Sequence, residues 1–405
     1  MTSIPNDLIE EICTRLPSKS IARFRCVSKQ WCSMLHRPDF TELFLTRSSA
    51  RPRLLFAIEG KDEWSFFSMT QPHNPYKKSS SLVVAADFHM TFPSGRGLMS
   101  CFPGYASGLI CLTQMPFLNK EVTSSIICNP NTGQYSILPI PIKHTYMRPF
   151  LGFDPIDKQF KVLFIKDDTS YYDDAGPRIL TLGAEKMRLR KIQCPLTHWP
   201  LFPKGICING VLYYIAETKD TRVIVCFYVR SEEFKFIDVE YFSFLGIKWI
   251  NFKGIFGLTK WVPDAAELRL SVLEDVEEEE WTEYLCTLRD GMIVDQLTAS
   301  ALRVVGVTAT GEIVLSKLCL SKPFYVFFVR PGRSSTLQRV EIQGIGDYNV
   351  ENSNDHFVEF FVDHVEDLNL NDVKYLKSSE GLNSIRKMPK LQHMEEVGER
   401  DRDMS

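Results

Sequence analysis

The chain has 405 residues, of which 44% are hydrophobic and 12% aromatic, and this is the composition of a packed protein rather than a disordered one. Its formal net charge of −3 argues against a dominant electrostatic attraction to nucleic acid or to an anionic membrane. The 11 cysteines are scattered, and the start of the chain is amphipathic with no secretory leader. We therefore expect a protein of the nucleus or cytoplasm, with two or three domain-sized units and reduced thiols.

Residues 1–45 predict a small module of three short helices. Asn6 and Asp7 can begin the first helix, Ser18 the second and Ser28 the third, while Pro17 and Pro38 break the pattern. Apolar residues recur at helical spacing along all three: Leu8, Ile9, Ile12, Leu16, Ile21, Phe24, Val27, Trp31, Met34 and Leu35. A module of this size buries little apolar surface by itself, so we expect it to complete its core against another protein.

This module resembles the F-box. The leading Leu-Pro of that family is Ile4-Pro5 here, a conservative departure, and its second Leu-Pro is Leu16-Pro17. The resemblance implies binding to the Skp-type adaptor of ubiquitin ligases, and through it to a cullin scaffold. The residues that would contact the adaptor are Ile4, Pro5, Leu8, Ile12, Leu16, Pro17, Ile21, Phe24, Val27 and Trp31.

Two other interpretations of the module are weaker. The apolar residues could form only a helical core, and this alternative is strongest for Ile9, Met34 and Leu35. A DNA-binding helix-turn-helix would need a basic surface. The basic residues here are nearly balanced by acidic ones, so no nucleic-acid partner is expected.

The hydrophobic period changes after the predicted linker at residues 46–52. Short apolar runs separated by turn residues follow, and they predict β-strands. Asn209-Gly210 is a strong hairpin signal, and Ala309-Thr310-Gly311 predicts another turn. Repeating units begin near residues 54, 108, 151, 206, 253 and 304, and this spacing of roughly 45–55 residues is typical of kelch-like propeller blades. Residues 53–366 therefore predict an all-β domain, most simply a β-propeller of uncertain blade number, with a two-sheet, sandwich-like arrangement as the alternative.

The β region resembles the F-box-associated domain of the large plant F-box family. The resemblance depends on an ordered series of modest motifs: residues 108–112, 129–133, 151–155, 209–214, 230–234, 272–275 and 306–313. It implies a domain that recruits a target protein. We expect the contacts that select the target in the loops at 71–81, 166–178, 193–204 and 274–281.

The sequence contains no recognisable catalytic, metal-binding or cofactor-binding constellation. It has no Cys-x-x-Cys pair, its glycines match no nucleotide-binding fingerprint, and residues 97–119 are too interrupted for a membrane helix. Residues 367–405 predict a C-terminal tail that is disordered toward its end.

The combined prediction is an α+β multidomain protein that acts as a non-catalytic substrate receptor of a Skp-cullin-F-box ubiquitin ligase. Two alternatives stay open: an F-box scaffold that directs no degradation, and a ligand- or sugar-binding β domain with incidental helices.

Overall fold

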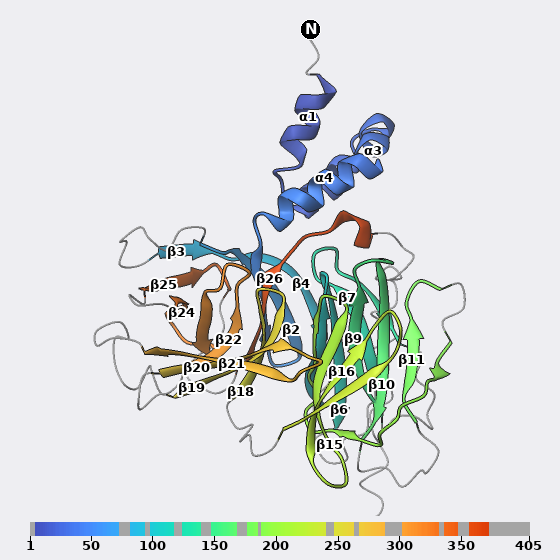
Figure 1. Cartoon of the computed structure of the whole chain (residues 1–405). Helices are drawn as coiled ribbons and strands as arrows, with labels where there is room; N and C mark the ends of the chain where they lie inside the picture. The colour runs from blue at the N-terminus through green and yellow to red at the C-terminus, as the bar shows by residue number, and fades with distance from the viewer. Residues whose placement is uncertain are drawn as a thin grey trace, which may run out of the picture.

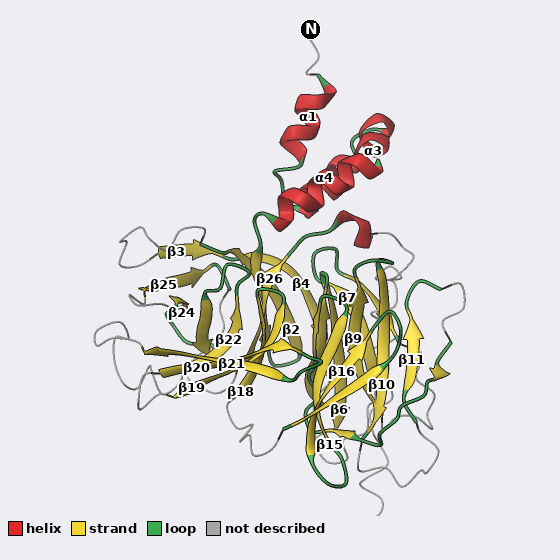
Figure 2. Cartoon of the chain, viewed as in Figure 1, coloured by secondary structure: helices red, strands yellow, loops and turns green. Residues whose placement is uncertain are grey.

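The computed structural model describes residues 5–72, 82–93, 98–116, 124–138, 147–167, 176–184, 188–239, 247–262, 267–287, 302–331, 336–346 and 356–371. Within these ranges, four helices stand at one end of a domain built of strands (Figures 1 and 2). The helices are α1 (Asn6–Cys13), α2 (Ser18–Arg25), α3 (Lys29–Leu35) and α4 (Pro38–Ser49).

The local signals that begin these helices are visible in the structure. The Ser28 side chain accepts a hydrogen bond from the Trp31 N–H at 3.2 Å and so caps α3. Pro38 occupies the first position of α4, where its missing N–H costs nothing. The expectation of three helices was wrong in one respect, because Pro38 begins a fourth helix that runs through Ser49. The predicted linker at 46–52 is accordingly only the short segment 50–52.

The strands form six separate antiparallel sheets with one parallel addition, which are the blades of a propeller. Blade 1 consists of β26 (Val358–His364), β1 (Arg53–Glu59), β2 (Glu63–Thr70) and β4 (Asp87–Pro93). Blade 2 consists of β5 (Leu98–Ala106), β6 (Leu109–Pro116), β7 (Ser124–Asn129) and β8 (Gln134–Ile137). Blade 3 consists of β9 (Met147–Asp154), β10 (Gln159–Lys166), β11 (Arg178–Thr181) and β12 (Arg190–Lys191).

The remaining three blades follow in chain order. Blade 4 consists of β13 (Trp199–Pro200), β14 (Ile206–Ile208), β15 (Val211–Glu217), β16 (Arg222–Tyr228) and β17 (Phe234–Asp238). Blade 5 consists of β18 (Ile247–Phe252), β19 (Ile255–Val262), β20 (Glu267–Asp275) and β21 (Glu280–Thr287). Blade 6 consists of β22 (Leu302–Val307), β23 (Ile313–Lys317), β24 (Phe324–Arg330), β25 (Thr336–Gln343) and β3 (Leu82–Ala85).

The ring of blades is closed by residues from both ends of the β domain. Strand β26 pairs with β1 in blade 1, with Phe360 opposite Phe56. Strand β3 crosses to the outer edge of blade 6, where it pairs in parallel with β25. These two pairings tie the beginning of the domain to its end, so the propeller does not depend on side-chain packing alone for closure.

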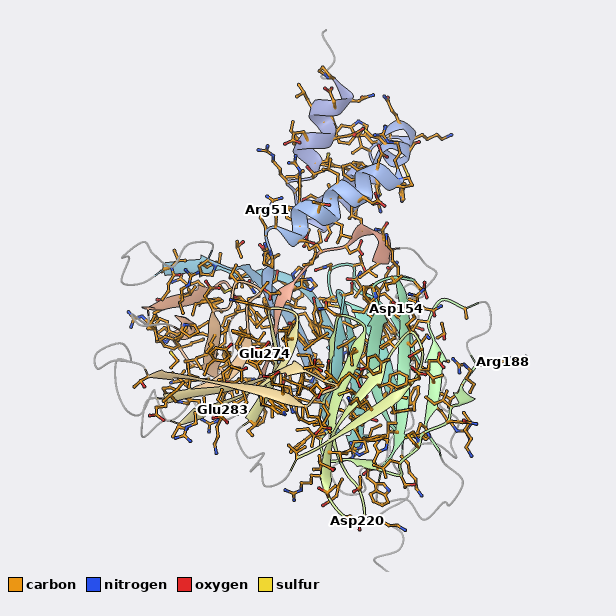
Figure 3. The ribbon with its side chains drawn as sticks, viewed as in Figure 1. Arg51, Asp154, Arg188, Asp220, Glu274 and Glu283 are labelled. Carbon is orange, nitrogen blue, oxygen red and sulfur yellow. The ribbon has the colours of Figure 1, made fainter. Side chains whose placement is uncertain are left out.

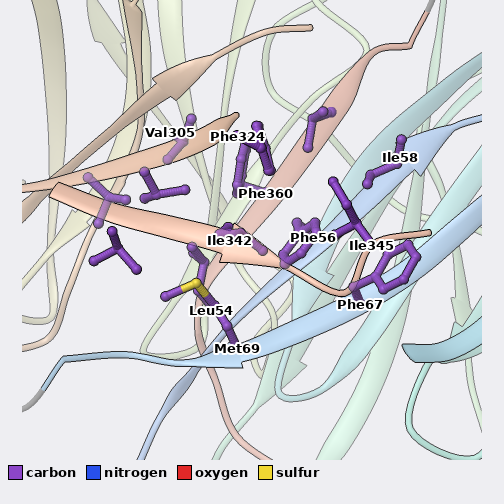
Figure 4. Packing of buried hydrophobic residues seen from close by; sticks show 14 of the residues in the cluster. Leu54, Phe56, Ile58, Phe67, Met69, Val305, Phe324, Ile342, Ile345 and Phe360 are labelled. Atoms are coloured by element: carbon purple, nitrogen blue, oxygen red, sulfur yellow. The ribbon is translucent and has the colours of Figure 1, made fainter. Parts of the chain in front are cut away.

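The core is divided among the blade interfaces. Each of six buried apolar clusters joins two neighbouring blades, and one of them joins blade 6 to blade 1 through Phe324 and Phe360 (Figure 4). The six sheets confirm the propeller prediction, equal the predicted repeating units in number and exclude the two-sheet alternative. The predicted starts near residues 108 and 253 were wrong in register, because each falls at the turn after the first strand of its blade. The expected turn at Asn209-Gly210 also forms, with both residues at positive φ.

Candidate docking surface and propeller channel

The helical module has its own buried core, and one member of that core comes from the far end of the chain. The core consists of Cys13, Ile21, Met34, Leu35, Phe40 and Phe44, together with Leu368. Leu368 belongs to η3 (Leu368–Asn371), a 3₁₀-helix that follows the last strand. The prediction of a C-terminal tail from residue 367 was therefore wrong for this segment, since it packs under the helices. Residues 372–405 lie outside the described part of the chain.

Polar contacts also hold the helices on the propeller, and one of them is buried. The Glu366 carboxylate accepts a hydrogen bond from the Ser18 N–H at 2.8 Å, and the Glu366 N–H donates to the Ser48 hydroxyl at 2.9 Å. The Lys19 ammonium donates to the backbone carbonyls of Phe88 at 2.8 Å and His89 at 2.9 Å. Burial raises the pKa of Glu366 despite these bonds. The module thus meets the propeller through both apolar and polar contacts.

The predicted adaptor-binding residues divide into four groups: exposed, half-buried, buried and outside the described residues. Leu8, Ile12 and Val27 are more than half exposed, at 52%, 54% and 65%. Two further residues, Pro5 and Pro17, are exposed as well.

The other predicted contacts lie deeper or outside the described residues. Leu16, Phe24 and Trp31 are half-buried against the helical core. Ile21 is fully buried, so in this arrangement it supports the surface from within and offers no contact area. Ile4 lies outside the described residues. Of the residues for which a purely structural role was considered, Met34 and Leu35 are buried and Ile9 packs against them.

Ion pairs orient α1 so that its apolar face points outward. Leu8 and Ile12 are four residues apart and share one face of the helix. On another side of α1, Glu10 pairs with Arg37 at 2.7 Å and Glu11 with Arg47 of α4 at 2.5 Å. Hydrogen bonds from Arg47, and then from Arg15, lower the pKa of Glu11. Large apolar side chains held in solvent in this way are typical of an interaction surface.

A channel runs through the propeller beneath the helices. Its volume is about 490 Å³, and its lining begins at Leu45 and Ser49 of α4. At the opposite end it is lined by Lys204, Lys248 and Glu359. Figure 3 marks the two ends of the molecule: Arg51 lies where α4 passes into the propeller, and Asp220 lies at the far end of the β domain. The Lys204 and Lys248 side chains are partly exposed, so the end of the channel that they line is open to solvent.

The loops expected to select a target are placed only in part. The segment 193–204 reaches the channel through Lys204. The segment 274–281 forms an exposed hairpin between β20 and β21, in which Glu277 pairs with Lys235 at 2.8 Å. Most of 71–81 and the middle of 166–178 lie outside the described residues.

The described residues lack two features that other functions would require. They contain no group of three or more His, Cys, Asp or Glu side chains placed to hold a metal ion. None of their helices is both long enough and apolar enough to cross a bilayer.

Sequence reasoning missed the residues that join the two units. Glu366 was assigned to the end of the last strand region and Leu368 to the tail, because a single leucine in an irregular segment has no periodicity to mark it as core. Lys204, Lys248 and Glu359 were missed as a cluster because they are 44 or more residues apart in sequence. The spacing of one such residue per blade could have suggested them once the repeat was recognised.

Comparison with known proteins agrees with this architecture. Residues 1–43 match the F-box domain family, and residues 53–365 match the family described as F-box associated beta propeller domain. The F-box protein At3g57590 of Arabidopsis thaliana is 46% identical over 398 residues, which cover 94% of each chain. The F-box protein At2g15640 of the same plant is 44% identical over 431 residues, covering 93% of this chain and 96% of its own. The chain therefore belongs to the family of F-box proteins that carry an F-box-associated β-propeller domain.

Proposed function

We propose that this protein is the substrate-recognition subunit of a Skp-cullin-F-box ubiquitin ligase, working in the nucleus or the cytoplasm. The observation that carries the proposal is the exposure of Leu8 and Ile12 on one face of α1, within a domain of the F-box family. Within the described part of the chain, no surface removes these two side chains from water. A Skp-type adaptor is the partner that the F-box family implies.

The protein would act by proximity and would not itself be catalytic. The helical module would dock on the adaptor and hence on the cullin scaffold, and the propeller would hold a target protein. Holding the target near a ubiquitin-charged enzyme raises the effective concentration of its lysines at the site of transfer. The contacts of Glu366 and Leu368 with the helices support this role, because they limit the freedom of the propeller relative to the docking surface.

The first test is co-expression of the full chain with a Skp-type adaptor, followed by size-exclusion chromatography and titration calorimetry. We expect a one-to-one complex. Burial of the exposed half of a Leu or Ile side chain contributes about 1–1.5 kcal/mol. Leu8→Ala with Ile12→Ala should therefore weaken adaptor binding by about 2–3 kcal/mol, or roughly 30- to 150-fold in Kd.

A matched control separates loss of docking from a general effect of removing surface apolar groups. Leu285 and Ile156 are 63% and 68% exposed on the propeller, and their double substitution by alanine should leave the adaptor Kd unchanged. An equal loss of affinity in both double variants would show that the α1 face is not the docking surface. A wild-type chain that ignores the adaptor would refute the receptor proposal. Stabilisation of the bound target by a proteasome inhibitor would distinguish a degradative receptor from a scaffold.

A further inference from the structure

Charged residues stand at equivalent positions of several blades near the end of the channel away from the helices, where Lys204, Lys248 and Glu359 belong to its lining. Each blade supplies one position near the start of its innermost segment. These positions are Glu359 in blade 1, Cys101 in blade 2, Arg148 in blade 3, Lys204 in blade 4, Lys248 in blade 5 and Arg303 in blade 6. Four of the six are basic and one is acidic.

The register of the inner strands brings neighbouring positions to the same level. A Cβ atom on Gly306 of β22 would lie 2.5 Å from Val362 of β26, so the two strands touch there. Arg303 and Glu359 each precede that contact by three residues. In the same way, a Cβ atom on Gly104 of β5 would lie 3.0 Å from Leu151 of β9.

Direct contacts join three of the six positions across the channel. Cys101 and Arg148 lie three residues before Gly104 and Leu151, just as Arg303 and Glu359 lie three residues before Gly306 and Val362. The Lys204 ammonium lies 2.6 Å from one Glu359 carboxylate oxygen, and the Lys248 ammonium lies 3.5 Å from the other. The Glu359 side chain is thus shared between two lysines that come from different blades.

Among the described residues, the charges of Lys204, Lys248 and Glu359 do not cancel. Arg148 has its own partner, because its guanidinium lies 2.5 Å from the Asp167 carboxylate. Lys204 and Lys248 together carry two positive charges against the single carboxylate of Glu359. Burial, together with the neighbouring Lys204 charge, lowers the pKa of Lys248, although Glu359 opposes the shift. An additional negative charge at this position would be favourable, since it would pair with an ammonium that now shares its counter-ion.

The site is also accessible and electrostatically distinct from the rest of the channel. The Lys204 and Lys248 side chains are 37% and 30% exposed, so both can reach a ligand. The end of the channel under α4 is lined instead by Asp363 and Asp367. An anion that enters from the open mouth would therefore be held at the two lysines.

We propose that Lys204 and Lys248 form a binding site for an anionic group, a phosphate or a carboxylate, at the open mouth of the propeller channel. In the free protein, the Glu359 carboxylate offsets the electrostatic repulsion between the two ammonium groups. It therefore competes with the anionic ligand for them. Ammonium groups suit this chemistry because each offers three rotatable donors to the oxygens of a phosphate. The group comes either from a free small molecule or from a side chain on a bound protein segment.

The test uses the full chain and sodium pyrophosphate as the probe, titrated by calorimetry at constant ionic strength. Glu359→Gln removes the competing charge and should tighten pyrophosphate binding at least threefold. Lys204→Met with Lys248→Met and Glu359→Gln removes both signs of charge and should weaken it at least tenfold. Lys61→Met, at an exposed lysine outside the channel lining, is the control and should change the Kd by less than twofold.

Thermal unfolding of each variant separates loss of binding from loss of folding. If the triple variant does not fold, Glu359→Gln alone still tests the proposal. If Glu359 were only a structural counter-ion for the lysines, its replacement would leave the affinity for pyrophosphate unchanged or lower it. The proposal is overturned by that result, by a folded triple variant that binds like wild type, or by absence of binding to both wild type and Glu359→Gln. A phosphoserine peptide that binds tenfold more tightly than free O-phosphoserine would assign the source to a protein segment, and equal affinities would assign it to a small molecule.

Discussion

Replacement of Leu368 by alanine should loosen the F-box helices without loosening the propeller. Leu368 is 2% exposed and lies in the helical core with Phe40 and Phe44. Truncation of a buried leucine costs about 2–5 kcal/mol, and the lower end applies where the surroundings can collapse into the cavity. Because η3 follows the last strand and is not hydrogen-bonded into a sheet, its side of the helical core can relax, and we expect about 2–3 kcal/mol for the local opening of the helices.

Hydrogen exchange measured by mass spectrometry reports that opening directly. A loss of 2–3 kcal/mol should speed exchange of the core-facing amides of α2 and α4 by roughly 30- to 150-fold, while β9 and β10 stay protected. Leu370→Ala is the matched control, since Leu370 lies two residues later and packs between blades 2 and 3. It should speed exchange in those blades and spare the helices. If Leu368→Ala leaves helical exchange unchanged, the helical core does not depend on the C-terminal segment.

Two further substitutions test the close packing of the inner strands and the titration of the Asp363 carboxyl. Gly306→Ala places a Cβ 2.5 Å from Val362 and should destabilise the chain by about 1–3 kcal/mol in urea unfolding, with partial rescue by Val362→Ala; additive losses in the double variant would refute the close approach. Burial raises the pKa of Asp363 from 3.8 to about 6, so the folded chain keeps a proton that the unfolded chain loses and stability falls as the pH rises through that window. Asp363→Asn should therefore raise the melting temperature relative to wild type at pH 7.5 but not below pH 4, and an equal gain at both would exclude titration of this carboxyl as the cause.

The fold was largely predictable because a propeller repeats a short-range signal. Each blade is built from neighbouring hairpins, and turn pairs such as Asn209-Gly210 fix their register locally. The two strands that leave this order could not be found in the same way. Strand β3 crosses from blade 1 to the edge of blade 6, and β26 returns to blade 1. Their pairing partners are hundreds of residues away in the sequence. The hydrophobic pattern of a strand does not show to which sheet the strand adds.

The docking residues were only partly predictable from the sequence. Helical spacing identified which residues of α1 are apolar, but Ile9 and Ile12 have similar side chains, and only the packing shows that Ile12 faces water while Ile9 lies on the core. The same holds for Ile21, which the family motif suggests as a contact and the structure buries. A motif shows that a position is apolar. A single sequence does not show whether the apolar side chain serves the folded core or a binding surface.

Strand β26 gives the proposed function a geometric basis. One end of it carries Glu359 beside the two lysines of the proposed anion site, and just beyond its other end Glu366 and Leu368 contact the helices. Glu366 lies seven residues after Glu359, and because β26 ends at His364 and Asp363 has a positive φ, the two are at most about 23 Å apart. A group bound at the two lysines would therefore be held at a fixed separation from the docking helices by a strand buried in blade 1. Because the helices are also joined to β1 through residues 50–52, they are anchored at two points. The position of a bound target relative to the adaptor would then be set by the propeller itself and not by a flexible linker.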